Sequence, residues 1–418
     1  MVELKKYKLR DIFSEFHSGE SIKASEIHDI DTFPVFGGNG IRGYCNRYNN
    51  DGEYIIIGRQ GAYCGNVRYY CGKAFLTEHA IVGKPKKAFN AVYLANKLSI
   101  INLSRFQGQS AQPGLAVETL SNVEIDLPTY STQESIGEVL FTFDKHIETL
   151  NAINRNLEKL ARQLYDYWFV QFDFPNKEGK PYKSGGGEMV WSEKLKREIP
   201  LNWSASSITA IADILSGGTP SKSVDEYWDG TIPFFGPTDI NNSVFQIDTK
   251  EHITQSGLIH CASSLFDEGT IIITARGSIG KLVIVGKQMA MNQSCYALRP
   301  KNGYTEYLYF LVIELIEHLK QKGSGSVFKS IIAIDIETSW LSIAPNDIIE
   351  DYCKLCSPIF DKIKQSTIEI DHLQHLRDEL LPMLLNGQVS VNDIKGYDFM
   401  LQDFSMAAEP EVNCDLSQ

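Results

Sequence analysis

The chain repeats itself once at a nearly constant spacing, and this repeat limits the folds that it can adopt. The stretches "EYIIIGRQGAYCGNV" (53–67) and "TIIITARGSIGKLVIV" (270–285) both read as a β-branched strand that runs into a glycine turn. Two further pairs follow at offsets of 215 to 217 residues: "AFLTEHAIVGKP" with "AMNQSCYALRP", and "GQSAQPGLAVETLSNVEIDLP" with "GSVFKSIIAIDIETSWLSIAP". A period of half the chain is far longer than a solenoid repeat, so the sequence predicts a duplicated pair of domains.

Each copy divides into a globular part and a long helix. Short runs of Val, Ile, Tyr and Phe between Gly, Asn and Pro predict a mostly β domain, which is followed by a segment of helical periodicity. We therefore predict an α+β fold with two repeated β-rich domains, separated by two long antiparallel helices that form a coiled-coil spacer. The predicted bounds are 1–128 for the first domain, 129–172 for the central helix, 173–200 for an exposed linker, 201–345 for the second domain, 346–388 for the C-terminal helix and 389–418 for an acidic tail.

Apolar residues at heptad spacing define the seam of each helix. Asn154 and Ala161 take the skipped positions of the first helix, and one polar Asn in such a seam sets the register of a coiled coil. Ser131 or Thr132 is a helix start signal, and Asn386-Gly387 is a stop signal. The seam residues of the first helix are Ile136, Leu140, Phe143, Ile147, Leu150, Leu157 and Leu164. Those of the second helix are Phe360, Ile363, Ile370, Leu373, Leu380 and Leu384.

The charge and the cysteines restrict the partners and the compartment. The net charge is −12, but most of the acidity lies after residue 345, so the globular parts can still carry a local basic face. Eight cysteines are too few over 418 residues for a disulfide scaffold. Cys353 and Cys356 form a C-x-x-C within an apolar-periodic helix, which favours core packing over a metal site. No apolar run has the length of a membrane span or the form of a signal peptide, so we expect a cytoplasmic protein without membrane contact.

Three patterns test whether the chain is an enzyme. The run from Phe36 to Gly40, within "FPVFGGNGIRGY", fits the F-x-G-x-G turn of methyltransferases, but the chain has no Pro-Pro pair for their catalytic loop. No Gly-Lys pair continues into a phosphate loop. Asp239 with Asp248 and Lys250 is a weak nuclease-like pattern that reads better as solvated turns. We expect no catalytic residue and no metal ligand, although a stand-alone nuclease or methyltransferase and a purely structural coiled-coil protein remain open.

Polar loops at matching places in the two copies are candidates for binding DNA. Two similar units on a rigid helical spacer can face successive major-groove segments of a duplex, where Arg reads guanine and Asn or Gln reads adenine. For any one of these residues a solvated loop side chain is an equal alternative. The candidates in the first copy are Asn39, Arg42, Arg59, Gln60, Tyr63, Asn66, Arg105, Gln107, Gln109 and Gln112. Those in the second copy are Arg276, Ser278, Lys281, Asn292, Ser324, Ser326 and Lys329.

Together these features resemble the specificity (S) subunit of type I restriction-modification systems. The resemblance is carried by two β-rich regions that end in "LP" or "AP", by helices with an "FDK" step, and by "WFVQFDFPNKEGKPYKSGGGEMVWSEKLKREIPLNW" between them. It implies that each target-recognition domain binds one half of a split, asymmetric DNA site and that the helices measure the unread spacer. It also implies two modification (methyltransferase) subunits and restriction (endonuclease and translocase) subunits. The family places S-adenosylmethionine, ATP and Mg on those partners and no cofactor in this chain.

Overall fold

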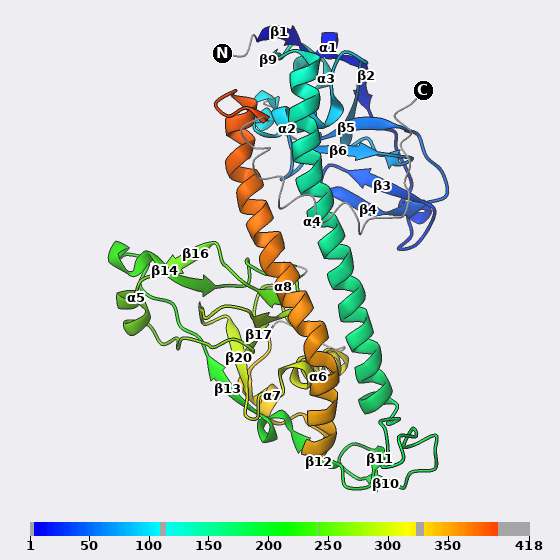
Figure 1. Cartoon of the computed structure of the whole chain (residues 1–418), viewed down its shortest axis with the longest axis vertical. Coiled ribbons are helices and arrows are strands. Elements are labelled where there is room, and N and C mark those ends of the chain that lie inside the picture. Colours follow the sequence, from blue (N-terminus) through cyan, green and yellow to red (C-terminus); the bar gives the residue numbers. More distant parts are fainter. Residues whose placement is uncertain (1–3, 109–113, 242, 323–329, 392–418) are drawn as a thin grey trace. The chain divides into compact units, whose positions relative to one another are not determined.

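The computed structural model describes residues 4–108, 114–241, 243–322 and 330–391, and contacts divide them into two compact units (Figure 1). Unit 1 joins Met1–Ile147 with Leu373–Gln418, and unit 2 is Glu148–His372. Each unit holds one β-rich domain together with a part of each long helix.

The domain of unit 1 is built on a four-stranded antiparallel sheet in the order β2-β8-β5-β6. A second sheet, β4-β3-β7, pairs β3 and β7 in parallel, and β1 pairs with β9. The strands are β1 Lys5–Lys8, β2 Phe13–Ser18, β3 Phe33–Gly37, β4 Gly40–Cys45, β5 Glu53–Gly58, β6 Val67–Cys71, β7 Phe75–Leu76, β8 Ala80–Pro85 and β9 Glu124–Leu127. The helices are α1 Leu9–Ile12, η1 Ala24–Glu26, α2 Ala91–Ser99, η2 Leu103–Phe106 and α3 Val117–Ser121.

The domain of unit 2 repeats this topology. Its main sheet runs β13-β20-β17-β18-β15, its second sheet is β16-β14-β19 with β14 and β19 parallel, and β12 pairs with β21. The strands are β12 Ser204–Ser207, β13 Ala212–Ser216, β14 Trp228–Phe235, β15 Phe245–Gln246, β16 Glu251–Ile253, β17 Ile271–Thr274, β18 Leu282–Val285, β19 Ala290–Met291, β20 Cys295–Pro300 and β21 Trp340–Ile343. The helices are η4 Ile208–Ala210, η5 Asp225–Tyr227, α5 Gln255–Ile259, α6 Thr305–Lys322 and α7 Ala333–Glu337.

The two long helices are α4, Tyr130–Tyr165, which continues into a π-helical turn at Asp166–Val170, and α8, Asn346–Leu385. The side chain of Gln133 anchors the start of α4, because its amide donates to the carbonyl of Pro128 at 2.9 Å and its oxygen accepts from the Asn90 amide at 3.1 Å. Gly387 follows α8 with a φ of 69°, as the stop signal predicts.

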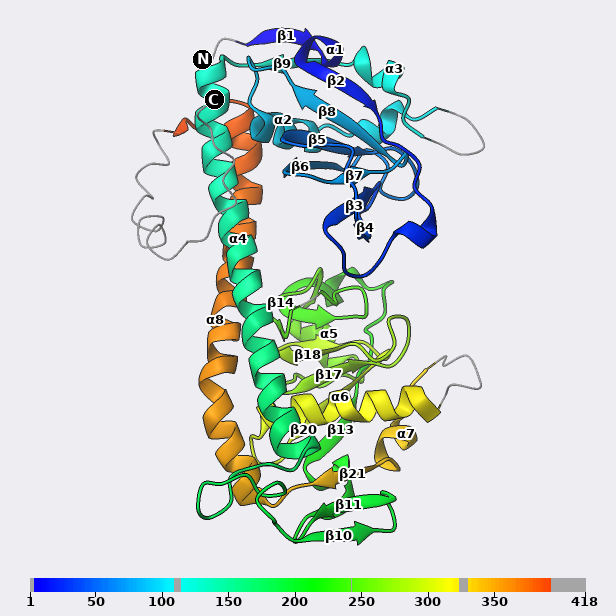
Figure 2. The same ribbon diagram turned by 90° about the vertical axis from the view of Figure 1, so that its right-hand side faces the viewer.

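Within each unit the two helices lie side by side and run antiparallel (Figures 1 and 2). In unit 2 the late part of α4 contacts the early part of α8, where Tyr352 Oη donates to the Ala161 carbonyl at 3.1 Å. In unit 1 the early part of α4 contacts the late part of α8, where Arg377 Nη1 donates to Asp144 Oδ1 at 2.8 Å. The α+β class, the duplication and the paired spacer helices are thus confirmed.

Most seam positions of the helices are buried. Leu157, Leu164, Leu373 and Leu380 are half-buried, and the other predicted seam residues are buried. The ends of the seam also belong to the domain cores. Ile136, Leu140 and Leu384 share a cluster with core residues of the first domain, and Phe360 and Ile363 share one with those of the second domain.

The linker predicted at 173–200 differs from an exposed connection. An antiparallel hairpin forms here from the strands β10, Met189–Ser192, and β11, Arg197–Pro200. Phe174 and Ile199 are buried in the core of unit 2, where Phe174 stacks on Trp203 with ring centroids 5.5 Å apart. The prediction of exposure was wrong at these positions because it rested on the Gly, Lys and Ser content of the whole segment. It overlooked the few apolar residues that are buried.

Two further predictions concern the membrane and the tail. None of the helices in the described part of the chain is long and apolar enough to cross a membrane. Of the predicted acidic tail, only residues 389–391 are described. The other predicted domain bounds stay predictions.

Candidate nucleic-acid interface

Four segments of unit 1 meet at one end of its sheets, and we call them the first edge: residues 36–40, 59–66, 77–79 and 103–107. The Arg59 amide donates to the His79 carbonyl at 2.9 Å, which joins the loop after β5 to the segment before β8. A Cβ placed on Gly38 would lie 3.1 Å from the His79 carbonyl oxygen, so the β3–β4 turn packs directly on this segment. A Cβ on Gly65 would lie 2.7 Å from the Ser104 nitrogen, which brings η2 to the same edge.

The first edge contains the predicted side chains that the structure describes in this copy, except Arg42 of β4, whose side chain lies beside Gly37 of the edge. Arg59, Gln60 and Gln107 are half-buried, while Asn39, Arg42, Tyr63, Asn66 and Arg105 are exposed. Arg59 Nη1 donates to the Glu78 carbonyl at 3.3 Å, and Gln60 Oε1 lies 3.1 Å from His79 Nδ1. These two side chains are therefore held by the scaffold, whereas the exposed ones are free to meet a ligand.

The loop after β5 is also fixed from inside. The thiol of Cys64 donates to the Arg59 carbonyl at 3.1 Å, and burial raises the pKa of this thiol. The group therefore stays protonated and keeps its donor role near neutral pH.

Sequence reasoning missed Arg68 at this edge. Its Nη2 donates to the Asn39 carbonyl at 3.2 Å, and its guanidinium lies 3.4 Å from where a Cβ on Gly40 would be. With Arg42, Arg59 and Arg105, four arginines lie in or beside the segments of the first edge, which also contain Glu78, although the whole chain is acidic. Arg68 is the one charged residue among the apolar and aromatic residues of β6, and this was the signal that could have identified it.

The corresponding segments of unit 2 form a second edge: residues 235–239, 275–281 and 292–294. Arg276, Ser278 and Lys281 are exposed on the loop after β17. Asn292 is half-buried, and its Oδ1 accepts from the Ser294 amide at 2.9 Å, so it shapes its own turn. Lys320 of α6 was missed; its Nζ lies 3.6 Å from the position of a Cβ on Gly280.

The two edges share one backbone scaffold. Gly61 and Gly277 lead the two loops with φ of 81° and 77°, a conformation that favours glycine. The backbone hydrogen bonds also repeat, at 2.8 to 3.0 Å. Arg59 N to His79 O in the first copy corresponds to Ala275 N to Ser294 O in the second. Likewise, Leu115 N to Arg59 O corresponds to Ile331 N to Ala275 O, and Thr77 N to Phe36 O corresponds to Asn292 N to Phe235 O. The scaffold is therefore duplicated while the exposed side chains differ.

Five predicted contacts, Gln109, Gln112, Ser324, Ser326 and Lys329, lie outside the described residues. The others stay predictions as DNA contacts.

The patterns considered for catalysis have structural roles. In "FGGNG", Gly38 and Asn39 form the two-residue turn of the β3–β4 hairpin, with Gly37 paired to Gly40. Asp239 accepts from the amides of Gly236 and Lys250 at 2.8 and 3.1 Å, and Asp248 accepts from His252 Nε2 at 2.8 Å. Among the described residues no three His, Cys, Asp or Glu side chains are grouped to hold a metal ion. Cys356 is buried, and Cys353 packs against the same core.

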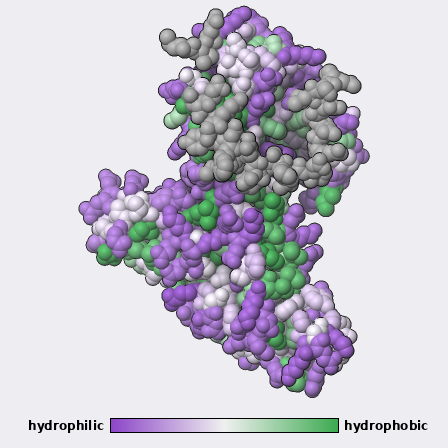
Figure 3. Space-filling model, in the orientation of Figure 1, coloured by the Kyte–Doolittle hydropathy of each residue, from purple (hydrophilic) through white to green (hydrophobic). Residues whose placement is uncertain are grey.

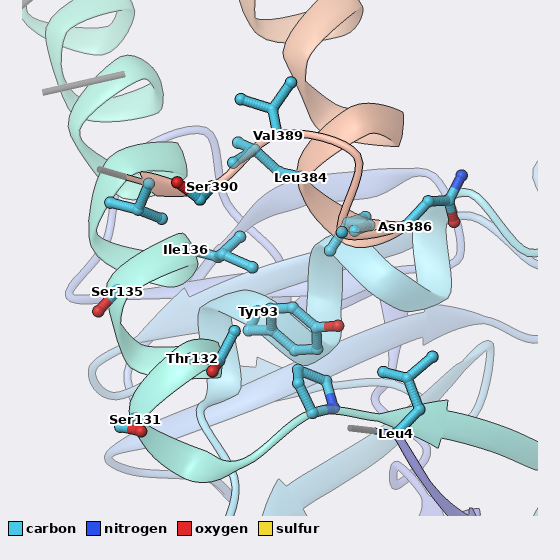
Figure 4. Close-up of a pocket in the computed structure, with 14 residues that line it drawn as sticks. Leu4, Tyr93, Ser131, Thr132, Ser135, Ile136, Leu384, Asn386, Val389 and Ser390 are labelled. Carbon is cyan, nitrogen blue, oxygen red and sulfur yellow. The ribbon is translucent and has the colours of Figure 1, made fainter. Parts of the chain in front are cut away.

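A cavity of about 500 Å³ in unit 1 (Figure 4) is lined by other residues than those of the first edge. The start of α4 contributes Ser131, Thr132 and Ser135, and the end of α8 contributes Leu384 and Asn386, with Tyr93 of α2 between them. Its lining includes no Asp, Glu, Lys or Arg, so it offers hydroxyl groups and apolar surface but no charged catalytic side chain.

The comparisons with known proteins agree with the duplication. The family described as type I restriction modification DNA specificity domain matches residues 1–159 and 200–370. The chain is 26% identical over 308 residues to the type I restriction enzyme MjaIX specificity subunit of Methanocaldococcus jannaschii, over 70% of this chain and 66% of that subunit. It is 36% identical over 165 residues to the type I restriction enzyme EcoprrI specificity subunit of Escherichia coli, over 38% of this chain and 41% of that subunit.

A solved structure supports the fold. The type I restriction-modification system S subunit from M. genitalium covers 92% of this chain and 96% of its own length, with a TM-score of 0.59 and 16% sequence identity.

Two copies of one scaffold that present different exposed side chains define a duplicated two-domain protein. The chain belongs to the type I restriction modification DNA specificity domain family, with one domain in each half. The relatives are named as specificity subunits of type I restriction enzymes, and the comparisons do not support a stand-alone nuclease or methyltransferase.

Proposed function

We propose that this chain is the sequence-specificity subunit of a type I restriction-modification complex, and that each edge reads one half of a bipartite, asymmetric DNA site. The observation that carries the proposal is the shared hydrogen-bond scaffold with different exposed side chains. A common backbone can hold each domain in the same way against the duplex, while different donors select different bases.

The paired helices then set the unread spacer and dock two modification subunits. Exposed apolar residues on α4 and on the π-helical turn that continues it support the docking role, because Ile153, Leu160 and Tyr167 recur every seven residues with 37%, 45% and 38% of their surface exposed. Figure 3 shows apolar surface where α4 runs. A stripe of this spacing suits a helix from a partner protein.

The chemistry belongs to the partners in this proposal. S-adenosylmethionine is bound by the modification subunits, and ATP and Mg are used by restriction subunits that translocate and cut DNA. This chain supplies sequence reading and assembly, and the complex acts on DNA in the cytoplasm.

Methylation mapping tests the proposal. Cells with and without the gene are compared over the whole genome, and loss of one bipartite adenine-methyl motif is expected. Replacing residues 1–128 with the first domain of a relative should change one half of that motif and leave the other half and the spacer unchanged. An unchanged methylome in both experiments would refute the proposal.

A further inference from the structure

A second cavity, of about 420 Å³, lies in unit 2 between the β10–β11 hairpin, the end of α6 and the start of β21. These elements lie together in Figure 2. Lys194 and Arg197 line it from the hairpin, His318 and Gln321 from α6, and Trp340 from β21. The hairpin lies in the segment 173–200, which the sequence predicts as a linker. The proposed function gives no role to this pocket.

The charge of the pocket suits an anion. Its lining contains no Asp or Glu. Arg197 is partly balanced by Glu314, whose Oε1 lies 3.7 Å from Arg197 Nη2. Lys194 is exposed, and no carboxylate of the described residues lies within 4 Å of its ammonium group. One lysine charge therefore remains available to a ligand.

The geometry of Trp340 argues against a stacked base. The Lys194 ammonium lies 3.6 Å from the centroid of the indole ring and covers that face. A nucleobase that stacked there would have to displace it. An anion gains from the same arrangement, because the indole holds the ammonium in place at the wall of the pocket.

The pocket adjoins the second edge. Gln321, which lines the pocket, follows Lys320, which lies against Gly280 in the loop after β17. One turn of α6 therefore connects the two sites. Duplex DNA presents phosphates on both sides of the base pairs that a protein reads, so a backbone phosphate next to the second half-site is the anion that this position favours.

The first copy has a different residue at this place. Trp340 is the first residue of β21, and the first residue of the corresponding strand β9 is Glu124, whose carboxylate lies 3.9 Å from the Lys6 ammonium. A carboxylate repels phosphate.

We propose that the pocket of Lys194, Arg197 and Trp340 binds a DNA backbone phosphate beside the second half-site, and that the first domain lacks this contact. The contact adds affinity without sequence information, so the DNA footprint extends further on the side of the second half-site. The inference rests on the proposed function for the placement of the second half-site.

The test uses the full chain assembled with its modification subunits. DNA affinity is measured on a duplex with the mapped site and on a duplex without it. The salt concentration is varied over roughly 50 to 200 mM, because the loss of affinity over this range depends on the number of phosphate contacts. Lys194→Gln, alone and with Arg197→Gln, should reduce the slope of log affinity against log salt by about one on both duplexes. The methylated motif should stay the same.

The matched control is Lys177→Gln with Lys180→Gln. Both lysines are exposed in the same linker and neither lines the pocket. This variant should leave the slope unchanged. Because Arg197 also packs over Phe172, a lowered unfolding temperature of the double variant would leave Lys194→Gln as the deciding variant.

Several results would overturn the inference. The first is an unchanged slope of log affinity against log salt in the Lys194 variant, and the second is an equal reduction of that slope in the control variant. The third is weaker assembly with the modification subunits at an unchanged slope, which would make the pocket a protein-docking site. Failure of the proposed function looks different, because the unmodified complex would then show no preference for its mapped site. The slope on the second duplex would still test the pocket.

Discussion

At the scale of single residues, the two edges separate side chains that build the scaffold from those that can read. Arg59 and Gln60 are tied to neighbouring segments, whereas Arg105 is exposed with its guanidinium 4.7 Å from the ring centroid of Phe106. Mutations at the two kinds of position should therefore have different effects. The first kind should disturb the edge, and the second kind should change DNA binding alone.

Arg105→Gln should weaken binding of the assembled complex to its site by about 1 to 3 kcal/mol, roughly 5- to 150-fold, because a forked donor is lost. Competition binding with the mapped duplex measures the effect. Lys87→Gln is the control, since Lys87 is exposed beyond the opposite end of β8. Equal losses in the two variants would mean that Arg105 contributes only general charge.

Gly58→Ala should destabilise unit 1 by about 1 to 3 kcal/mol, as overpacking does. The new Cβ would lie 2.4 Å from the Tyr63 carbonyl oxygen and 2.7 Å from that of Gly38, and both are backbone atoms of the first edge. Thermal unfolding measures the change. Gly108→Ala, with nothing within 4 Å of the added carbon, should leave the midpoint where it is. A similar midpoint for both variants would show that the edge yields easily.

Two buried thiols should be unreactive in the folded protein. Burial raises the pKa of Cys295 to about 12 and that of Cys356 to about 11. At pH 8 iodoacetamide should label both slowly, and the partly exposed Cys261 faster, as read by mass spectrometry. In the unfolded chain these thiols ionise near pH 8.5, whereas in the folded chain they stay protonated at that pH. As the pH rises above that value, only the unfolded state is stabilised by losing the protons, so the free energy of unfolding should fall. Rapid native labelling of Cys295 would contradict the assigned burial.

At the scale of elements, the helix seam contains one polar defect. Asn154 Nδ2 lies 3.4 Å from Thr367 Oγ1, while its Oδ1 is buried without a hydrogen-bond partner in the described part of the chain. A single Asn in a seam costs stability and fixes how two helices align. The sequence pattern had placed Asn154 at a seam position, and the contact agrees with it.

Asn154→Leu should raise the thermal midpoint of the chain, because it removes an unsatisfied buried group that costs about 1 to 3 kcal/mol. Asn156→Leu, two residues along on the exposed side of α4, is the control and should change the midpoint little. A lower midpoint for Asn154→Leu would show that the bond to Thr367 outweighs the unpaired oxygen.

At the scale of the whole molecule, the helices are the element whose length the proposed function uses. Seven residues inserted in each helix, after Ile147 in α4 and after His372 in α8, keep the heptad register and add about 10 Å. At about 3.4 Å per base pair, the unread spacer of the methylated motif should grow by about three base pairs. Methylation mapping measures the spacer, and the two half-sites serve as the internal control. A spacer of unchanged length would show that the length of the helices does not set the distance between the two half-sites.

Much of this architecture could be predicted because duplication shows each signal twice. The heptad seam from Ile136 to Leu164 predicted α4, and the strand-and-glycine pattern around Gly61 and Gly277 predicted two equivalent loops. Periodicity does not show long-range pairing, so the parallel pairing of β3 with β7 was missed. Arg68 was missed because its role depends on a turn that is remote in sequence, at Asn39.

The late part of α8 completes the core of the first domain, and this has a consequence for how the protein is made. Leu384 and Leu385 pack with Leu9 and Tyr93, and Lys97 Nζ donates to the Leu385 carbonyl at 3.3 Å. A ribosome therefore finishes the second domain before the chain that completes the first one has emerged. A nonsense mutation shortly before codon 384 would leave a hole in the domain made first, so a lesion near the end of the gene would impair the half encoded at its beginning.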